Sequence, residues 1–268
     1  MLSILGKILN FRSCFVVALF LCCIQASAQS SAHPWRIANC PGDDCAIYYR
    51  GQIRTADVKA LLAETSKVEV KWIYVSSVGG SGLPAISLAN RVREWGATIV
   101  VEDICMSACA NYVFPSARKK VINDGAIIIW HGGGQSKAMQ SAIEIAEQKA
   151  QTALDSGDVS AGQGWLDAIK DAYSLKEEER QLFAQLGVDE RVTRVGELIG
   201  EPASKNWTIS PEDFAKFGIL NVSIPSGYAN EAYLKNLKAH VPIKVDVLNH
   251  GQMASAPKHE SRNLNPKP

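Results

Sequence analysis

Two residues with the chemistry of a nucleophile and a base follow two successive apolar runs of this sequence. Residues 97–101 form a β-branched run that leads to Ser107, and residues 126–130 form a second run that ends at His131. A segment of small residues follows Ser107, so we expect its hydroxyl beside the free N–H groups and positive dipole of a helix start. One βαβ step would set the two strands side by side with their ends level. Taken singly, the residues are more simply explained as a helix cap and an unrelated buried histidine.

A glycine-rich turn supplies a third element of the predicted site. Residues 76–82 include Gly79 and Gly80 and follow the strand-like run 68–75. Because glycine lets bare backbone approach a substrate, the N–H of Gly79 or Gly80, together with that of Ala108, is the predicted oxyanion hole. The turn lacks the lysine of a phosphate-binding loop and the GxGxxG spacing, which argues against nucleotide binding.

Five short motifs follow one another along the chain, at residues 48–53, 77–81, 105–110, 129–131 and 209–219. They are Tyr-Tyr-Arg-Gly-Gln-Ile, Ser-Val-Gly-Gly-Ser, Cys-Met-Ser-Ala-Cys-Ala, Ile-Trp-His and Ile-Ser-Pro-Glu-Asp-Phe-Ala-Lys-Phe-Gly-Ile. In this order they resemble the Clp protease proteolytic subunit and its relatives in the ClpP/crotonase superfamily. Val78 stands where that family has the proline of Ser-Pro-Gly-Gly-Ser. The resemblance covers residues 45–225 and aligns Ser107 with the nucleophile and His131 with the catalytic histidine.

The resemblance implies an α/β fold of the ClpP/crotonase type, a repeated ββα superhelix with a mainly parallel sheet in a single domain. It implies an exported serine peptidase that acts on a peptide or protein substrate, without a cofactor or a metal. An extended peptide would add as a strand beside the Gly79 segment. The family's fold also implies a homo-oligomer, in which a helical excursion at residues 165–200 would be buried. The Cys-x-Ser-x-Cys arrangement suggests a secreted branch rather than the cytosolic protease.

The acid that would orient the imidazole is the least determined member of the site. Counting back from the closing motif puts Glu201 at the position of the family's aspartate, and a glutamate can orient an imidazole as an aspartate does. Asp167, Asp171 and Asp189 are rivals. A Ser/His dyad without an acid also stays open.

Two other functions stay open beside the peptidase. A non-catalytic member of the same fold would be a periplasmic binding or assembly protein with a vestigial Ser-His pair. The unmatched acid favours it, and so does Pro115, which should stop or bend the helix after Ser107. A crotonase-type acyl-CoA enzyme is disfavoured, because coenzyme A does not suit an exported protein. The net charge of +1 and the pI of 7.6 give no electrostatic reason to expect nucleic acid as a partner.

Residues 1–28 have the pattern of a signal peptide. Lys7 and Arg12 precede an apolar core at 14–24, and an Ala-x-Ala cleavage site follows, which would make Gln29 the first residue of the mature protein. The apolar core is shorter than the stretch of about 20 residues that spans a membrane. We therefore expect an exported protein, periplasmic in a Gram-negative bacterium, with no stable membrane span after cleavage.

Four cysteines, Cys40, Cys45, Cys105 and Cys109, would remain after cleavage. An even number in an oxidising compartment favours disulfides. The first two flank a turn, and the last two are one helical turn apart, so that about 6 Å between their Cα atoms would permit a bridge. That second bridge would fix the turn that carries Ser107. Two small buried thiols are nearly as well supported, and a four-cysteine zinc site is the third alternative.

Strand-like and helix-like runs alternate, which is typical of an α/β protein. After the signal peptide we expect an N-terminal extension at 29–44, one domain at 45–225, and a C-terminal segment at 226–268 that is disordered from about residue 249. Strands are predicted at 45–50, 68–76, 97–103, 126–130 and 219–224. Helices are predicted at 54–65, 83–95, 108–114 and 137–153. A polar break is expected at 155–164, and a solvated turn at 176–180 within the helical excursion.

Overall fold

The computed structural model describes residues 33–200, 205–237 and 241–254. The predicted signal peptide, Gln29 and Glu201 lie outside these residues. Within them, seven strands form a mixed, mainly parallel sheet in the order β1-β2-β3-β4-β5-β8, with β6 paired to β4. The strands are β1 (Trp35–Ala38), β2 (Ala46–Arg50), β3 (Trp72–Ser77), β4 (Thr98–Met106), β5 (Lys119–Ile122), β6 (Ile127–Ile129) and β8 (Val222–Ser223). Strand β1 is antiparallel to β2, and the other neighbours are parallel. The predicted α/β class is therefore confirmed.

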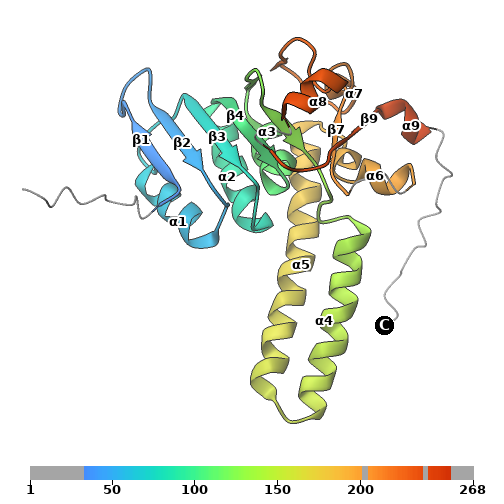
Figure 1. Cartoon of the computed structure of the whole chain (residues 1–268). Coiled ribbons are helices and arrows are strands. Elements are labelled where there is room, and N and C mark those ends of the chain that lie inside the picture. Colours follow the sequence, from blue (N-terminus) through green and yellow to red (C-terminus); the bar gives the residue numbers. More distant parts are fainter. Residues whose placement is uncertain (1–32, 201–204, 238–240, 255–268) are drawn as a thin grey trace, which may run out of the picture. The chain divides into compact units, whose positions relative to one another are not determined.

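Helices α1 (Thr55–Glu64) and α2 (Gly82–Trp95) pack side by side on one face of the sheet (Figure 1). Helix α2 ends at Gly96, whose φ of 60° is the left-handed conformation that commonly terminates helices. The other helices are the π-helix η1 (Cys109–Val113), α3 (Phe114–Ser116), α4 (Lys137–Asp155), α5 (Val159–Leu186), the 3-10 helix η2 (Glu190–Arg194), α6 (Val195–Leu198), α7 (Asp213–Lys216), α8 (Glu231–Leu237) and α9 (His250–Ala254). Strands β7 (Trp207–Ile209) and β9 (Asp246–Leu248) form a separate parallel pair.

Strand β4 lies at the centre of the sheet and pairs with two different strands along one edge. Its first half, from Thr98 to Val101, pairs with β5, and its last residues, from Ile104 to Met106, pair with β6. Its other edge pairs with β3. Because all these strands are parallel, the residues that follow β3, β4 and β6 emerge at the same end of the sheet.

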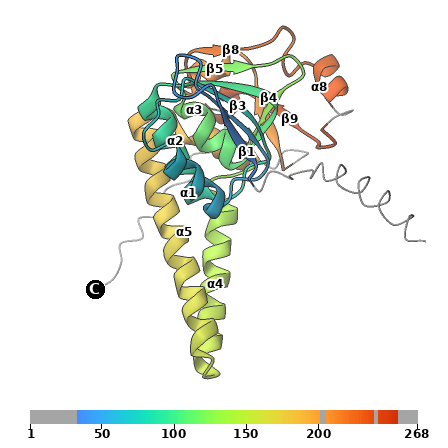
Figure 2. The same cartoon turned by 90° about the vertical axis from the view of Figure 1, so that its left-hand side faces the viewer.

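Helices α4 and α5 form a hairpin that projects from the sheet (Figures 1 and 2). The polar break predicted at 155–164 is much shorter in the structure. Helix α5 already begins at Val159, because the Asp158 side chain accepts a hydrogen bond from the N–H of Ala161 at 3.0 Å and caps the helix. The solvated turn predicted at 176–180 is wrong, since these residues lie within α5 and Glu179 is fully buried. No helix in the described part of the chain is long and apolar enough to span a membrane.

The sheet and the core extend beyond the limits expected at residues 45 and 225. Strand β1 lies in the expected N-terminal extension and pairs with β2. On the other side, Tyr228 and Tyr233 are buried, and the Tyr233 hydroxyl donates to the carbonyl of Ala126 at 2.6 Å. The tail expected to be disordered from about 249 begins with helix α9, which covers residues 250–254. Residues 255–268 lie outside the described residues.

Candidate functional site

Ser107 occupies the tight turn between β4 and η1. Its φ of 57° is left-handed, a conformation that residues other than glycine rarely adopt. The turn is held on both sides, because the Ser107 N–H donates to the carbonyl of Ile129 at 3.0 Å and its carbonyl accepts from the N–H of Asn111 at 2.7 Å. A non-glycine residue held in this region is often part of a functional site. The half-buried side chain thus stands between a strand end and a helix start.

Strands β4 and β6 lie side by side and parallel, as the sequence predicts. Met106 is opposite Ile129, so Ser107 and His131 follow the ends of adjacent strands. The end of β6 is fixed by Trp130, whose N–H and carbonyl exchange hydrogen bonds of 2.8 Å with Trp207. Within the described residues, no hydrogen bond joins the Ser107 hydroxyl to the imidazole.

His131 lies at the surface, yet its ring is partly desolvated by the atoms around it. This desolvation lowers the pKa of His131 from its ordinary value of 6.5. The imidazole is therefore neutral at pH 7, which is the form that can accept a proton from a hydroxyl.

The glycine turn after β3 packs directly on the Ser107 turn. A Cβ atom at Gly79 would lie 2.5 Å from the carbonyl oxygen of Met106 and 2.6 Å from the Cβ of Ser107. The φ of 87° at Gly79 is also left-handed. Gly80 packs equally closely on Ile53, between β2 and α1, since a Cβ atom at Gly80 would lie 2.3 Å from the carbonyl oxygen of Ile53. Only glycine fits either position.

The hydrogen bonds of this turn distinguish the two predicted oxyanion donors. The N–H of Gly79 donates to the Ser77 hydroxyl at 3.1 Å, and that hydroxyl donates to the carbonyl of Gly51 at 2.6 Å. Among the described residues, the N–H groups of Gly80 and Ala108 have no acceptor. Of the two alternatives, Gly80 is therefore the donor that is free to pair with Ala108.

Of the four predicted acids, the structure describes Asp167, Asp171 and Asp189, and none of these three is bonded to His131. Asp189 caps η2 and binds an arginine two residues further on. Asp167 is exposed on α5, and Asp171 lines a groove described below. Glu201 lies outside the described residues, so its assignment stays a prediction.

Two disulfides join Cys40 to Cys45 and Cys105 to Cys109. The predicted disulfides are thereby confirmed, and all four cysteines are paired in this way in place of free thiols or a four-cysteine zinc site. The second disulfide closes across Ser107, from the end of β4 to the first residue of η1. No group of three or more potential metal ligands occurs among the described residues.

The helix after Ser107 is a π-helix, which the sequence did not predict. Its residue Asn111 donates a side-chain hydrogen bond of 2.8 Å to the carbonyl of Gly132, in the loop after His131. Isolated π-helical turns often occur at functional sites. Pro115 does not stop the helix at residue 114 as expected: it lies in the first turn of α3, where a proline is tolerated, and α3 continues η1 as far as Ser116.

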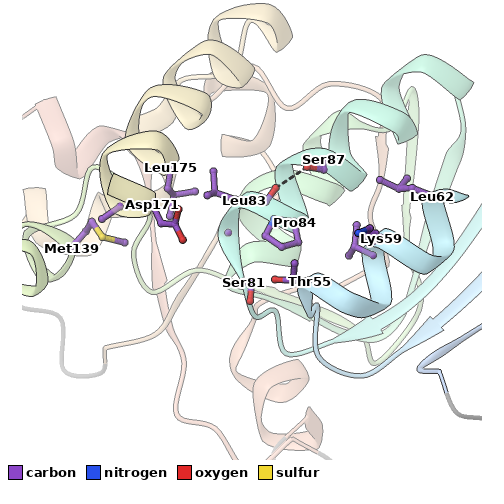
Figure 3. Close-up of a pocket in the computed structure, with 13 residues that line it drawn as sticks. Thr55, Lys59, Leu62, Ser81, Leu83, Pro84, Ser87, Met139, Asp171 and Leu175 are labelled. Carbon is purple, nitrogen blue, oxygen red and sulfur yellow. Dashed lines mark hydrogen bonds between the residues drawn. The ribbon is translucent and has the colours of Figure 1, made fainter. Parts of the chain in front are cut away.

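A groove of 720 Å³ lies beside the glycine turn and begins at Ser81. In Figure 3, Met139, Asp171 and Leu175 of the α4–α5 hairpin face Leu83 and Pro84 at the start of α2. Thr55, Lys59 and Leu62 of α1 complete it on the other side. The walls are mostly apolar, with Lys59 and Asp171 as the charged groups.

Glu179 is a candidate that the sequence-based expectations missed. It is fully buried in contact with both the η1 helix and the loop after His131. Leu175 and Phe183 lie four residues away on either side, so Glu179 falls on the apolar face of α5. This spacing is the signal that could have found it.

No protein-family model matches this sequence, and neither does any curated protein. The functional conclusion therefore depends on the geometry around Ser107.

Proposed function

We propose that this protein is an exported serine hydrolase, a peptidase of the Clp type with Ser107 as nucleophile and His131 as general base. One observation carries the proposal. Ser107 is held at a left-handed turn that packs on the glycine turn of β3 and lies next to the end of β6, where His131 follows. The two disulfides and the predicted signal peptide support export to an oxidising compartment, the periplasm in a Gram-negative cell.

The reaction needs one proton transfer in each direction. The Ser107 hydroxyl attacks the acyl carbon while His131 takes its proton, and the N–H groups of Gly80 and Ala108 stabilise the negative charge on the acyl oxygen. When the carbon–nitrogen bond breaks, His131 returns the proton to the departing amine. Water then releases the acyl group by the same route. The base contributes roughly 10² to 10⁴ in rate, and one oxyanion donor roughly 10² to 10³.

The substrate that fits this arrangement is an extended peptide or an unfolded segment of a protein. Its backbone would lie along the Gly79–Gly80 segment, where the N–H of Gly80 has no acceptor among the described residues. The groove that begins at Ser81 would take a neighbouring apolar side chain of the substrate, since its walls include Leu83, Met139 and Leu175.

A fluorophosphonate probe tests the proposal directly, because it forms a covalent bond with an activated serine. We expect it to label folded wild-type protein at Ser107, and we expect Ser107→Ala and His131→Ala to lose labelling while keeping their thermal stability. Ser160→Ala removes an exposed hydroxyl at the start of α5, outside the groove, and is the matched control. Folded wild-type protein that the probe does not label would overturn the proposal.

The second candidate function is a non-catalytic peptide-binding or assembly protein with the same fold. It is favoured by the missing hydrogen bond between Ser107 and His131, and by the absence of a carboxylate on His131, within the described residues. Such a protein would bind extended peptides with equal affinity before and after Ser107→Ala, and would not react with the probe.

The acid is tested separately with Glu201→Gln. Weaker labelling of this variant would show that Glu201 orients the imidazole. Unchanged labelling would leave a Ser/His dyad or another acid.

A further inference from the structure

The carboxylate of Glu179 is fully buried and accepts three hydrogen bonds. Its Oε2 accepts from the hydroxyl of Tyr112 at 2.5 Å and from the N–H of Gly134 at 2.7 Å. Its Oε1 accepts from the N–H of Gln135 at 3.2 Å. Burial raises the pKa of this carboxyl group, because the charged form loses water.

The three donors lie on the two segments that follow the residues of the proposed catalytic pair. Tyr112 lies on η1, the helix that follows Ser107, and Gly134 and Gln135 lie in the loop that follows His131. One side chain on α5 thus holds both segments.

The loop has little freedom to take another path around this carboxylate. A Cβ atom at Gly133 would lie 2.9 Å from Oε2 of Glu179 and 2.8 Å from the hydroxyl oxygen of Thr193. The side-chain amide of Gln135 adds a hydrogen bond of 2.9 Å to the carbonyl of Lys176, one turn before Glu179 on α5. Both backbone N–H groups and a side chain of the loop therefore form hydrogen bonds with α5.

Packing alone does not explain a carboxylate at this place. Burying a charged group has a large desolvation cost that its partners must offset, and an apolar residue of similar size would fill the same space. The neighbours on the same face of α5, Leu175 and Phe183, are apolar. Besides filling space, Glu179 supplies two carboxylate oxygens that accept hydrogen bonds from the loop after His131 and from η1.

We propose that Glu179 is a positioning residue that sets the placement of the His131 loop relative to the Ser107 turn. Its effect on catalysis rests on the proposed function, whereas its effect on the loop does not. Because Glu179 lies on α5 and α4 begins at the end of the same loop, the hairpin holds the loop from both sides.

The test compares Glu179→Gln with wild type by two measurements. A glutamine has only one acceptor oxygen, and its amide would face an N–H donor. We expect backbone hydrogen exchange in residues 132–135 to rise at least about tenfold, since two of its N–H groups lose a carboxylate acceptor. We expect the maximal rate of fluorophosphonate labelling at Ser107 to fall about 10- to 100-fold, with the half-saturating probe concentration unchanged.

Two controls separate positioning from general loss of stability. Glu178→Gln changes an exposed neighbour on α5 and should leave both measurements unchanged. Phe183→Leu removes a buried ring that packs on Tyr112, with ring centroids 6.4 Å apart, and lowers stability without touching the carboxylate. Equal exchange and equal labelling in Phe183→Leu and Glu179→Gln would overturn the proposal.

Labelling and hydrogen exchange together distinguish failure of the proposed function from failure of the positioning role. If wild-type protein is not labelled but exchange in residues 132–135 rises only in Glu179→Gln, the positioning role stands and the hydrolase does not. If Glu179→Gln does not fold, Tyr112→Phe removes one of the three hydrogen bonds. Unchanged exchange in both η1 and the loop of that variant would overturn the positioning role.

Discussion

The backbone of Gly79 packs so closely on Ser107 that a Cβ atom at position 79 would lie 2.6 Å from the Ser107 Cβ. The same atom would lie 2.5 Å from the carbonyl oxygen of Met106 and 2.9 Å from the amide nitrogen of Ala108. These neighbours are mostly backbone, in a turn fixed by its own hydrogen bonds, so they cannot move aside. The two turns are therefore one structural unit, and the predicted oxyanion donors belong to it.

Gly79→Ala is expected to displace the Ser107 turn. The methyl group meets fixed backbone, and alanine at a φ of 87° is strained, so we expect a loss of about 1–3 kcal/mol in unfolding free energy. Labelling of Ser107 should fall by about 100-fold or more. Gly164→Ala is the control, because it lies in α5 with nothing within 4 Å of the added methyl group and should stabilise that helix. Normal labelling of Gly79→Ala would show that the two turns are independent.

The β-branched runs predicted the strands of the central sheet, and their parallel order predicted that Ser107 and His131 follow adjacent strands. Strands β1 and β5 were missed because they are short and carry Arg36 and Lys119, so that only pairing with longer neighbours reveals them. Glu179 was missed for a related reason. Its neighbours in the chain are charged, and only the position of α5 against η1 makes it a core residue.

The disulfides were predictable from the even number of cysteines and the short spacing within each pair. The helical geometry assumed for the second pair was wrong, because Cys105 lies on β4 and Cys109 on η1, with the Ser107 turn between them. The π-helix and the left-handed φ of Ser107 were not predictable. Both depend on how β4, β6 and the glycine turn meet, which involves segments far apart in the sequence.

The labelling rate of Ser107 should depend on the protonation of His131. Because desolvation lowers the pKa of this imidazole from 6.5, the neutral form persists to more acidic pH, and the rate should fall only as the pH drops below about 6.5. A carboxylate beside the ring would raise that pKa instead. The measurement is the rate of fluorophosphonate labelling against pH. A midpoint above the ordinary value would contradict the desolvated imidazole and support an orienting acid, with Glu201→Gln as the variant that should lower it again.

The disulfide across Ser107 should matter more for reactivity than for stability. A loop this short gains little from cross-linking in the unfolded state, so Cys105→Ala with Cys109→Ala should reduce unfolding free energy only modestly. The turn would lose the bridge between its two ends, and we expect labelling of Ser107 to fall at least about tenfold. Cys40→Ala with Cys45→Ala removes the other short disulfide and is the matched control. Equal labelling in the two double variants would contradict a role for the bridge at the site.

The α4–α5 hairpin exposes apolar side chains that fit the predicted homo-oligomer. Leu166 and Tyr173 are two turns apart on α5 and are 43% and 50% exposed. We expect the wild-type protein to assemble at micromolar concentration and Leu166→Glu with Tyr173→Glu to weaken that assembly, as measured by light scattering. Ala168→Glu changes an exposed residue on the opposite face of α5 and is the control for added negative charge. A monomeric mass for the wild type would contradict the prediction.

Lys120 makes stability depend on pH in the alkaline range. Its side chain is only 5% exposed, and its ammonium group donates to the carbonyls of Ala117 at 2.6 Å and Leu220 at 3.1 Å. Burial lowers the pKa of Lys120 from 10.5 to about 8. Between these two values the unfolded chain holds a proton that the folded chain has released. Stability from this group is therefore lowest below pH 8 and rises as the pH increases towards 10.5.

Urea unfolding of wild type and Lys120→Met at about pH 7.5 and about pH 9.5 measures this contribution. We expect the wild type to gain about 1–2 kcal/mol relative to the variant between the two conditions, because the charged form of a buried lysine is the one penalised. Lys119→Met removes the exposed neighbouring charge on β5 and should keep the wild-type pH dependence. The same change with pH in wild type and Lys120→Met would mean that the ammonium stays charged, held by its two carbonyl partners.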